Sequence, residues 1–389
     1  MRIGIVAPEF PPDIGGMQTY AFEFSRELAN RGYEVHVFTK PHPEGEIRIP
    51  GIRVIPVLAG WRRRDRRILT EYHIDVWHVM NAAYGWLALE TSPVIISVHG
   101  NDFLRPYIPL ERLGLSHWPG LWRSGKWVPA IESTLARWLT LRTVRKALPK
   151  ATHIIANSCY TEKVFLERYP ACRGKTSAGM VGVSQDYLEV AYNLPHRQKT
   201  SLVTVARLAE PRKNVDLVLR ALAGLKEKHD FTYTIVGDGG LRPALESLST
   251  ELGLSGRVRF TGFVSHDELK IILGRSDLFI LVSSIIPGSH EGFGIAYLEA
   301  NACGVPVLAA RLAGAVEAVS EGVSGMFVDE ITVPAVGMAL DRFLSGQAAF
   351  EASSCRDFAR QFTWKKVVDH AIGSYQSQPH ATGLADRVP

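Results

Sequence analysis

Two glutamates flank a glycine-containing turn in the segment SHEGFGIAYLEA, residues 289–300. Glu291 and Glu299 stand eight positions apart, on either side of Gly292 and Gly294. Two carboxylates at one turn suggest first a general acid and a general base. If a helix begins near Gly294, however, backbone N–H groups lie at its positive end and are available to phosphate.

This helix gives the two acids different roles. Glu299 lies in its second turn, where a carboxylate can accept hydrogen bonds from ribose hydroxyls. Glu291 lies outside the helix and can hold hydroxyls of a sugar. The alternative is an acid at a helix start together with a solvated helical glutamate.

Two cations and two glycines suit a phosphate-rich ligand. Arg207 ends the apolar run LVTVARL and Lys213 follows six residues later, so that together they could neutralise a diphosphate leaving group. Gly15 and Gly16 precede an expected helix and leave N–H groups suited to phosphate oxygens. Solvated surface charges and a tight turn are the alternatives.

Two other glycine segments carry weaker signals. VGDGG, which contains Gly237, lacks the full G-x-G-x-x-G spacing and is interpreted first as a strand-to-helix turn. In FTGFV, Gly262 permits a close backbone approach to a flat base, with Phe263 and Val264 beside it. An ordinary strand end fits this segment equally well.

Short apolar runs alternate with helical patterns along the whole chain, and the rhythm restarts at Ser201. We therefore expect an α/β fold of two Rossmann-like, doubly wound domains that face a central cleft. A first helix is expected from about Thr19 to Asn30, and an interdomain linker between Tyr169 and Thr200. The expected strands are RIGIV, EVHVFT, IRVIPV, DVWHVM, VIISVHG and THIIANS in the first half, and LVTVARL, FTYTIVGDGG, VRFTGFV, LFILVSS, VPVLAA and GMFVDE in the second.

His99 ends one of these strands, in VIISVHG, a position from which side chains project toward a cleft. A lone histidine also serves structurally, so both interpretations stay open. The length of 389 residues and the 46% apolar content are sufficient for two or three domains with large cores.

The formal charge of +5, from 44 basic and 39 acidic residues, is too small to indicate nucleic-acid binding but fits a protein that handles anions. Two segments of the first half, residues 60–69 and 118–150, are rich in arginine, lysine and tryptophan. Such helices can lie on an anionic bilayer surface. A solvated basic face and an RNA-binding patch are the alternatives.

Nothing in the sequence predicts a membrane-spanning helix or a signal peptide, because the initial apolar run is short and no later run reaches 18 residues. The four cysteines have neither disulfide-framework nor zinc spacing. We expect a cytoplasmic protein, peripheral at the inner face of the cytoplasmic membrane.

Together these segments resemble the retaining glycosyltransferases of family 4, which have the GT-B fold. The resemblance covers nearly the whole chain, through PPDIGGMQ, VARLAEPRKN, VGDGG with Arg242, FTGFVSHDEL, SHEGFGIAYLEANACGVPVLA and GAVEAV. It is closest to mannosyltransferases that act on lipid-linked acceptors. Two segments depart from the family pattern: VGVS at residues 181–184, and Ala313 to Val316, which precede a retained Glu317.

The resemblance implies an acceptor-side domain over residues 1–190, a nucleotide-sugar-binding domain over 200–365, and a C-terminal helix over 366–389 that crosses back to the first domain, with a tail. It implies transfer of a hexose, with mannose as the candidate, from a GDP- or UDP-linked sugar to a glycan or lipid-linked acceptor in surface polysaccharide or glycolipid synthesis. No metal or other cofactor is implied. The implied partners are the donor, the acceptor and an anionic membrane surface, without nucleic acid.

The site residues that the resemblance implies fall into two groups. Catalytic roles fall to Arg207, Lys213, Glu291 and His99, the first two at the diphosphate, the third at the transferred sugar and the last near its hydroxymethyl group. Donor binding falls to Gly15, Gly16, Gly237, Gly262, Phe263, Val264, Gly292, Phe293, Gly294 and Glu299.

Three other functions are weighed against transfer. A sugar-nucleotide 2-epimerase shares the fold and differs in its product. A non-catalytic nucleotide-sugar-binding subunit is disfavoured because the Arg, Lys and both Glu positions are filled. An NAD dehydrogenase is disfavoured because the dinucleotide fingerprint is incomplete in both halves.

Overall fold

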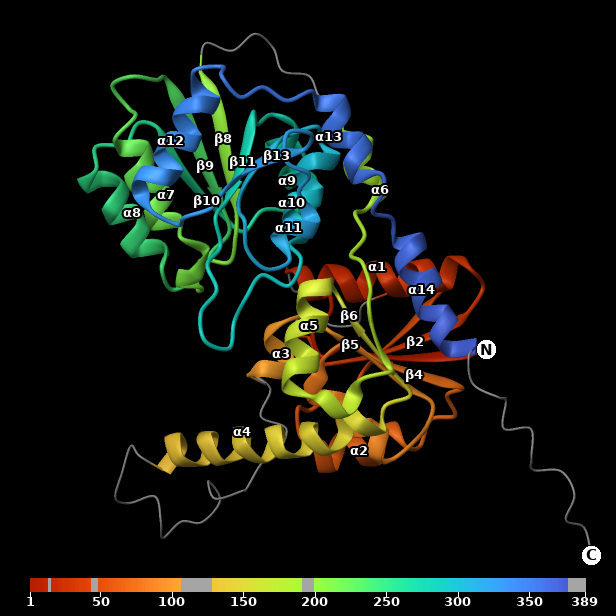
Figure 1. Ribbon diagram of the computed structural model, residues 1–389. Coiled ribbons are helices and arrows are strands. Elements are labelled where there is room, and N and C mark those ends of the chain that lie inside the picture. Colours follow the sequence, from red (N-terminus) through yellow and green to blue (C-terminus); the bar gives the residue numbers. More distant parts are fainter. Residues whose placement is uncertain (13–14, 43–47, 106–127, 191–198, 377–389) are drawn as a thin grey trace, which may run out of the picture.

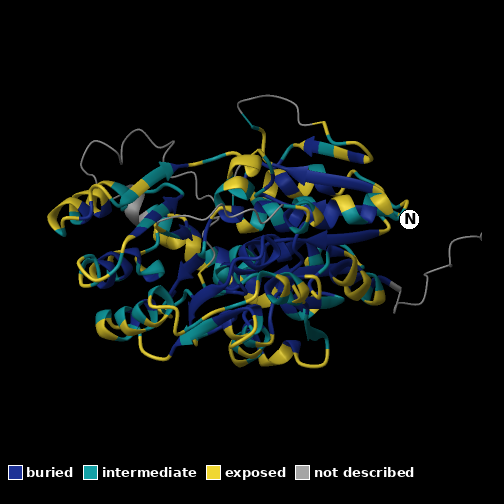
Figure 2. Ribbon diagram, turned by 90° about the horizontal axis from the view of Figure 1, so that it is seen from above, coloured by how far each residue is buried: buried dark blue, intermediate teal, exposed yellow. Residues whose placement is uncertain are grey.

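The computed structural model describes residues 1–12, 15–42, 48–105, 128–190 and 199–376. It contains two α/β domains, each with a parallel sheet covered by helices on both faces (Figure 1). This confirms the expected fold class. The strands are largely buried, whereas the outer faces of the helices are exposed (Figure 2), as is usual for parallel sheets covered on both sides.

The N-terminal sheet has the order β3-β2-β1-β4-β5-β6-β7, with all neighbours parallel. Its strands are β1 (Arg2–Val6), β2 (Glu34–Thr39), β3 (Ile52–Pro56), β4 (Val76–Val79), β5 (Val94–Val98), β6 (His153–Ala156) and β7 (Thr176–Ala178). Its helices are α1 (Gly16–Asn30), α2 (Arg62–Leu69), η1 (Ala82–Leu89), α3 (Asn101–Leu104), α4 (Val128–Ala147), η4 (Leu148–Lys150), α5 (Cys159–Arg168) and η5 (Pro170–Cys172).

The C-terminal sheet has the order β10-β9-β8-β11-β12-β13, again parallel throughout. Its strands are β8 (Thr200–Val205), β9 (Phe231–Val236), β10 (Val258–Gly262), β11 (Leu278–Leu281), β12 (Val307–Ala310) and β13 (Gly325–Val328). The remaining helices are α6 (Gln185–Leu188), η6 (Pro211–Lys213), α7 (Val215–Ala223), α8 (Arg242–Glu251), α9 (His266–Gly274), α10 (Ile295–Ala302), α11 (Ala315–Ala318), α12 (Val333–Leu344), α13 (Ala352–Ala359) and α14 (Trp364–Gln376).

Two expected boundaries were wrong. The first helix begins at Gly16 rather than near Thr19, because Gly15 already acts as its N-cap. The stretch expected as a linker from Tyr169 contains the strand β7, which extends the N-terminal sheet by pairing with β6. Its three residues, Thr-Ser-Ala, form no apolar run, so only the partner strand reveals it.

The chain passes between the domains at two adjacent segments. Val183 N–H donates to the Phe362 carbonyl at 3.0 Å, and Val183 forms a parallel bridge with Thr363. A Cβ on Gly182 would lie 2.6 Å from the Trp364 ring, so the VGVS segment needs glycine for this close approach.

Helix α14 packs against α1 of the N-terminal domain (Figure 1). The guanidinium of Arg31 bonds the Lys365 carbonyl and the Asp369 carboxylate. At the far end of α14, the Tyr375 hydroxyl contacts His78 Nδ1 at 2.6 Å. The last described helix of the chain, α14, therefore packs onto the N-terminal domain, as expected. The expected tail, residues 377–389, lies outside the described residues.

Candidate active site

Most of the predicted site residues follow the carboxyl ends of strands. His99 follows β5, Arg207 follows β8 and Gly237 follows β9, while Gly262 ends β10. Because carboxyl ends of parallel strands meet at one edge of a sheet, each domain gathers its candidates at one edge. The contacts described below join these two edges across the interdomain interface.

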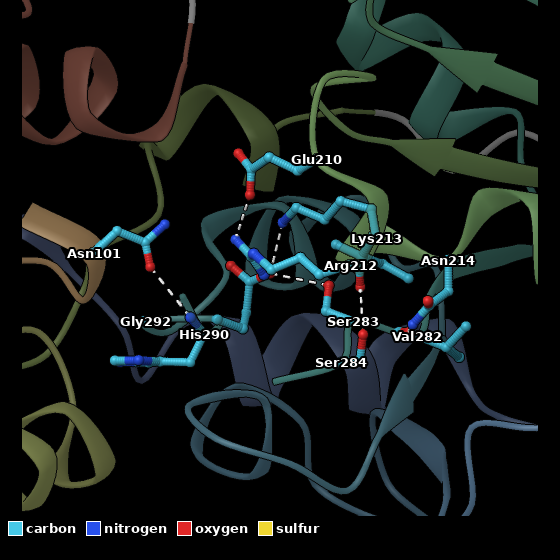
Figure 3. A network of polar contacts seen from close by, with 12 residues as sticks. Asn101, Glu210, Arg212, Lys213, Asn214, Val282, Ser283, Ser284, His290 and Gly292 are labelled. Carbon is cyan, nitrogen blue, oxygen red and sulfur yellow. Dashed lines mark hydrogen bonds and ion pairs between the residues drawn. The ribbon is translucent and has the colours of Figure 1, made fainter. Parts of the chain in front are cut away.

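The Glu291 carboxylate is the centre of a polar network in the C-terminal domain. Its partners Arg212, Lys213 and Ser283 are labelled in Figure 3. Lys213 Nζ donates to Glu291 Oε2 at 2.6 Å, Ser283 Oγ donates at 3.1 Å and Arg212 Nη1 donates at 3.3 Å. All three donors use the same oxygen. Among the described residues, the other oxygen, Oε1, accepts no hydrogen bond.

This network fixes the charge of Glu291. Burial opposes ionisation, but the cations of Lys213 and Arg212 and the hydrogen bonds outweigh it and lower the pKa of Glu291 to about 2. Arg212, whose side chain is only 5% exposed, also pairs with Glu210 at 2.7 Å. Glu291 is therefore a carboxylate at neutral pH and cannot serve as a proton donor.

Arg207 has different surroundings, because it is exposed and has no ion-pair partner among the described residues. A Cβ on Gly15 would lie 3.1 Å from Arg207 Nη2 and 2.6 Å from Gln18 Oε1. A Cβ on Gly16 would meet nothing within 4 Å. The structure therefore brings Arg207 of one domain to the glycine pair of the other, beside the N-terminus of α1.

The loop from Glu291 to Gly294 runs between the two domains with little space around its backbone. A Cβ on Gly292 would lie 2.6 Å from Asn157 Nδ2 and 2.7 Å from the His99 carbonyl oxygen. Gly294 has φ 96° and caps α10, as expected from its position before the helix. The Phe293 side chain is buried 5.7 Å from the ring of Phe362, so only its backbone is available to a ligand.

Glu299 lies in an environment opposite to that of Glu291. It is 8% exposed, and burial raises its pKa to about 7. The Tyr187 hydroxyl favours the charged form, whereas the carboxylates of Asp186 and Glu23 disfavour it. No cation contacts it among the described residues. The assignment of Glu299 to ribose binding stays a prediction.

His99 is held by contacts within the N-terminal domain. Its backbone N–H donates to Asp102 Oδ1 at 2.9 Å, and its ring meets the Tyr20 ring edge-on at 4.5 Å. Burial lowers the pKa of His99 to about 3, so the imidazole is neutral. Its Nε2 atom is buried and has no hydrogen-bond partner within the described ranges.

The other two glycine segments form the ends of β9 and β10. Gly237 N–H donates to the Gly262 carbonyl at 2.9 Å, and a Cβ on Gly237 would lie 2.0 Å from the Ala206 oxygen. This close approach explains why a glycine stands at the turn that follows β9. Phe263 is 64% exposed and Val264 half-buried, which leaves the Phe263 ring available at the surface.

A second set of contacts crosses between the domains at α5. The Glu317 carboxylate of the C-terminal domain accepts the backbone N–H groups of Cys159 at 2.8 Å and Tyr160 at 2.9 Å. Thr161 Oγ1 donates to the Gly292 carbonyl at 3.3 Å. Glu317, which lies in α11, therefore caps a helix of the other domain.

Several side chains of this region were missed by the sequence reasoning. Arg212 stands between a proline and Lys213, and its charge was visible but not its burial. Gln18 precedes the expected first helix, whereas Ser283 and Asn157 are ordinary polar residues at the ends of the expected strands LFILVSS and THIIANS. Both Ser283 and Asn157 could have been predicted, because each lies at the carboxyl end of an expected strand, where cleft residues gather.

Two family descriptions match the chain. Residues 14–178 match "Glycosyltransferase Family 4", and residues 191–362 match "Glycosyl transferases group 1". The D-inositol 3-phosphate glycosyltransferase of Mycolicibacterium smegmatis is 27% identical over 93% of this chain and 86% of its own. The GDP-mannose-dependent alpha-(1-6)-phosphatidylinositol monomannoside mannosyltransferase of the same organism is 28% identical over 88% of each chain.

Among solved structures, HepE of Anabaena in complex with UDP and glucose superimposes with a TM-score of 0.69. The similarity covers 97% of this chain and 99% of HepE, at 19% identity. The likeness at this identity concerns the fold. The two family matches together span most of the chain, the relatives are matched over most of their length, and the fold has two parallel-sheet domains. The chain therefore belongs to the glycosyltransferases of GT-B type.

Proposed function

We propose that the protein is a retaining, metal-independent hexosyltransferase of family 4, which moves a hexose from a nucleotide diphosphate sugar to a glycan or lipid-linked acceptor. The observation that carries this proposal is the meeting of Arg207 with Gly15 across the interdomain interface. Arg207 thus offers a permanently charged guanidinium beside the N-terminus of α1, where a diphosphate would be bound from both sides.

Lys213 supplies the second charge. Its ammonium group has three N–H donors, of which one binds Glu291, so the others are available to phosphate oxygens. As the bond between the anomeric carbon and the phosphate oxygen breaks, negative charge develops on the diphosphate, and these cations stabilise it. In a retaining displacement the acceptor hydroxyl attacks from the same face and its proton passes to the leaving phosphate oxygen.

Glu291 and His99 hold the transferred sugar in this proposal. The Oε1 atom of Glu291 accepts sugar hydroxyls, since the carboxylate is charged and that oxygen is not used by the network. The neutral imidazole of His99 offers a hydrogen bond through Nε2. The enzyme then acts by positioning and electrostatic stabilisation rather than by a covalent intermediate.

The donor is GDP- or UDP-linked, with mannose as the candidate sugar. A relative depends on GDP-mannose by name, whereas HepE was solved with UDP and glucose. A thermal-shift screen of GDP, UDP, ADP and their sugars tests this choice, because a ligand of the folded state at 100 times its Kd adds roughly 2.7 kcal/mol to the unfolding free energy. Product analysis with the selected donor then separates transfer from epimerisation. No shift with any of these compounds would refute the proposal.

We also propose that the acceptor is reached at an anionic membrane surface, at the inner face of the cytoplasmic membrane. Helices α2 and α4 both lie at the end of the N-terminal domain that faces away from the C-terminal domain (Figure 1). None of the helices in the described ranges has the length and apolar character needed to cross a bilayer. Contact at the surface is therefore the form of association proposed.

The side chains of α4 support this surface role. Trp138 is 52% exposed with the Arg142 guanidinium 5.5 Å from its ring, and Arg145 and Lys146 are exposed one turn further on. This combination suits a headgroup layer. Residues 118–127 of the basic segment lie outside the described residues.

Sedimentation with anionic vesicles at low salt tests the membrane proposal. Wild-type protein should sediment, and an Arg142→Glu, Arg145→Glu variant should remain in the supernatant. Each basic residue near such a surface contributes about 1 kcal/mol, so two reversals give a large change. Lys228→Glu, in the C-terminal domain, is the control and should sediment like wild type. Absence of wild-type binding would contradict the proposal.

A further inference from the structure

Asn157 is a buried polar residue whose amide oxygen is unused. It directly follows β6 and is 8% exposed. Its Oδ1 atom is buried and has no hydrogen-bond partner in the part of the chain that the structure describes. Buried amide oxygens in proteins are nearly always paired, so an unpaired one next to a candidate site requires an explanation.

The position of this amide is set by the other domain. A Cβ on Gly292 would lie 2.6 Å from Asn157 Nδ2 and 3.2 Å from Oδ1, so the amide lies directly against the loop that carries Glu291. The His99 carbonyl oxygen would be 2.7 Å from the same Cβ. Asn157 and His99 therefore line the backbone of Gly292 together, from two neighbouring strands, β6 and β5.

A structural asparagine in the same domain shows the difference. Asn81 is 1% exposed, and its Oδ1 accepts the Ala83 N–H at 2.9 Å and caps η1. Its amide oxygen is thus used in a hydrogen bond that stabilises the fold. The Asn157 oxygen has no such partner among the residues that the structure describes, although the Asn157 backbone N–H donates to the Val98 carbonyl of the neighbouring strand. The Asn157 backbone is therefore part of the sheet, whereas its amide oxygen makes no hydrogen bond to the described part of the protein.

We propose that the Asn157 amide binds a hydroxyl group of the sugar substrate, which makes Asn157 a specificity-determining residue of the N-terminal domain. This inference rests on the proposed transferase function. A hydroxyl both donates and accepts, so it pairs with the amide in either orientation of the group. The hydroxyl belongs either to the transferred hexose or to the acceptor.

Asn157→Ala tests the inference through two readouts that a structural role would not combine. The melting temperature should stay unchanged or rise, because the substitution removes an unpaired buried oxygen and breaks no hydrogen bond. The affinity for GDP-mannose or UDP-glucose, measured by calorimetry, should fall about 5- to 10-fold, the effect of one neutral hydrogen bond. The affinity for GDP or UDP alone should not change.

The same variant also shows whether the hydroxyl belongs to the transferred hexose or to the acceptor. If nucleotide-sugar affinity is unchanged but the KM for the acceptor rises about 5- to 10-fold, the hydroxyl belongs to the acceptor. Asn81→Ala is the control and should lower the melting temperature, since it removes a helix cap.

Two results would count against the inference, and they differ from failure of the proposed function. A melting temperature that falls as far as that of Asn81→Ala shows a structural role. Unchanged affinity for nucleotide sugar together with an unchanged acceptor KM shows that no hydroxyl is bound. Wild-type protein that binds none of these nucleotides refutes the transferase proposal itself, and the inference with it.

Discussion

Replacing Lys213 with methionine should show how much the Lys213 cation stabilises the charged Glu291 carboxylate. Methionine keeps most of the length of the lysine side chain and removes its charge. The carboxylate then retains Arg212 at 3.3 Å and Ser283 at 3.1 Å but loses its shortest contact, at 2.6 Å. A mostly buried charge that loses a partner is strongly destabilising.

The magnitude follows from the pKa of Glu291. A fall from 4.5 to about 2 corresponds to roughly 3 kcal/mol of unfolding free energy. Because the folded-state pKa is depressed, this stabilisation is complete above about pH 4.5 and is lost as the pH falls toward 2. We expect Lys213→Met to lose about 2 to 3 kcal/mol at neutral pH, and the difference from wild type to shrink in acid.

Urea unfolding of both proteins from about pH 7 to about pH 3 measures this difference. Lys228→Met is a matched control, because Lys228 pairs with Asp341 at 2.7 Å in the same domain but its side chain is 60% exposed. Such a surface pair should contribute less than about 1 kcal/mol. The reasoning is refuted if the two variants lose equal stability, or if the loss in Lys213→Met persists undiminished in acid.

The same variant has a catalytic readout. With the leaving-group charge less stabilised, kcat/KM for donor turnover should fall about 10²- to 10³-fold. A loss within about threefold of wild type would show that Lys213 holds Glu291 but does not assist the diphosphate.

Three further outcomes can be measured. Glu317→Gln should lower the unfolding free energy by about 1 kcal/mol, because a neutral amide accepts the Cys159 and Tyr160 N–H groups less strongly than the carboxylate does; an unchanged value in urea unfolding contradicts this. Glu299→Gln should gain stability over wild type as the pH rises from 4.5 to about 7, because the raised pKa makes ionisation of the buried acid unfavourable for the folded state, and parallel pH profiles would disprove it. Gly292→Ala should lower the melting temperature by an amount equivalent to about 1 to 3 kcal/mol, since its Cβ would lie 2.6 Å from the facing domain; an unchanged temperature argues against a close interface.

Much of the fold could be predicted because its strands are buried on both faces. The residues of β11, for example, are Leu-Phe-Ile-Leu, a continuous apolar run that is visible without any partner strand. The strand β7 has no such run and exists through its pairing with β6, so it could not be found from local pattern. The VGVS departure likewise had no local explanation until Trp364 was seen against Gly182.

The site was predictable as a set of residue types but not as a set of contacts. Lys213 and Glu291 are 78 positions apart, and their ion pair depends on the packing of η6 beside the loop after β11. The helix cap that Glu317 gives to α5 joins residues 158 positions apart. Such contacts depend on the relative placement of elements, which residue spacing does not encode.

The two glutamates of SHEGFGIAYLEA show this division most clearly. The sequence by itself determined that two acids flank a glycine turn at the start of a helix. Only the tertiary structure decided their charge states, with the pKa of Glu291 at about 2 and that of Glu299 at about 7. The physical reason is that both side chains are largely removed from water, but Glu291 contacts two cations of its own domain, whereas Glu299 lies near a tyrosine and two further acids.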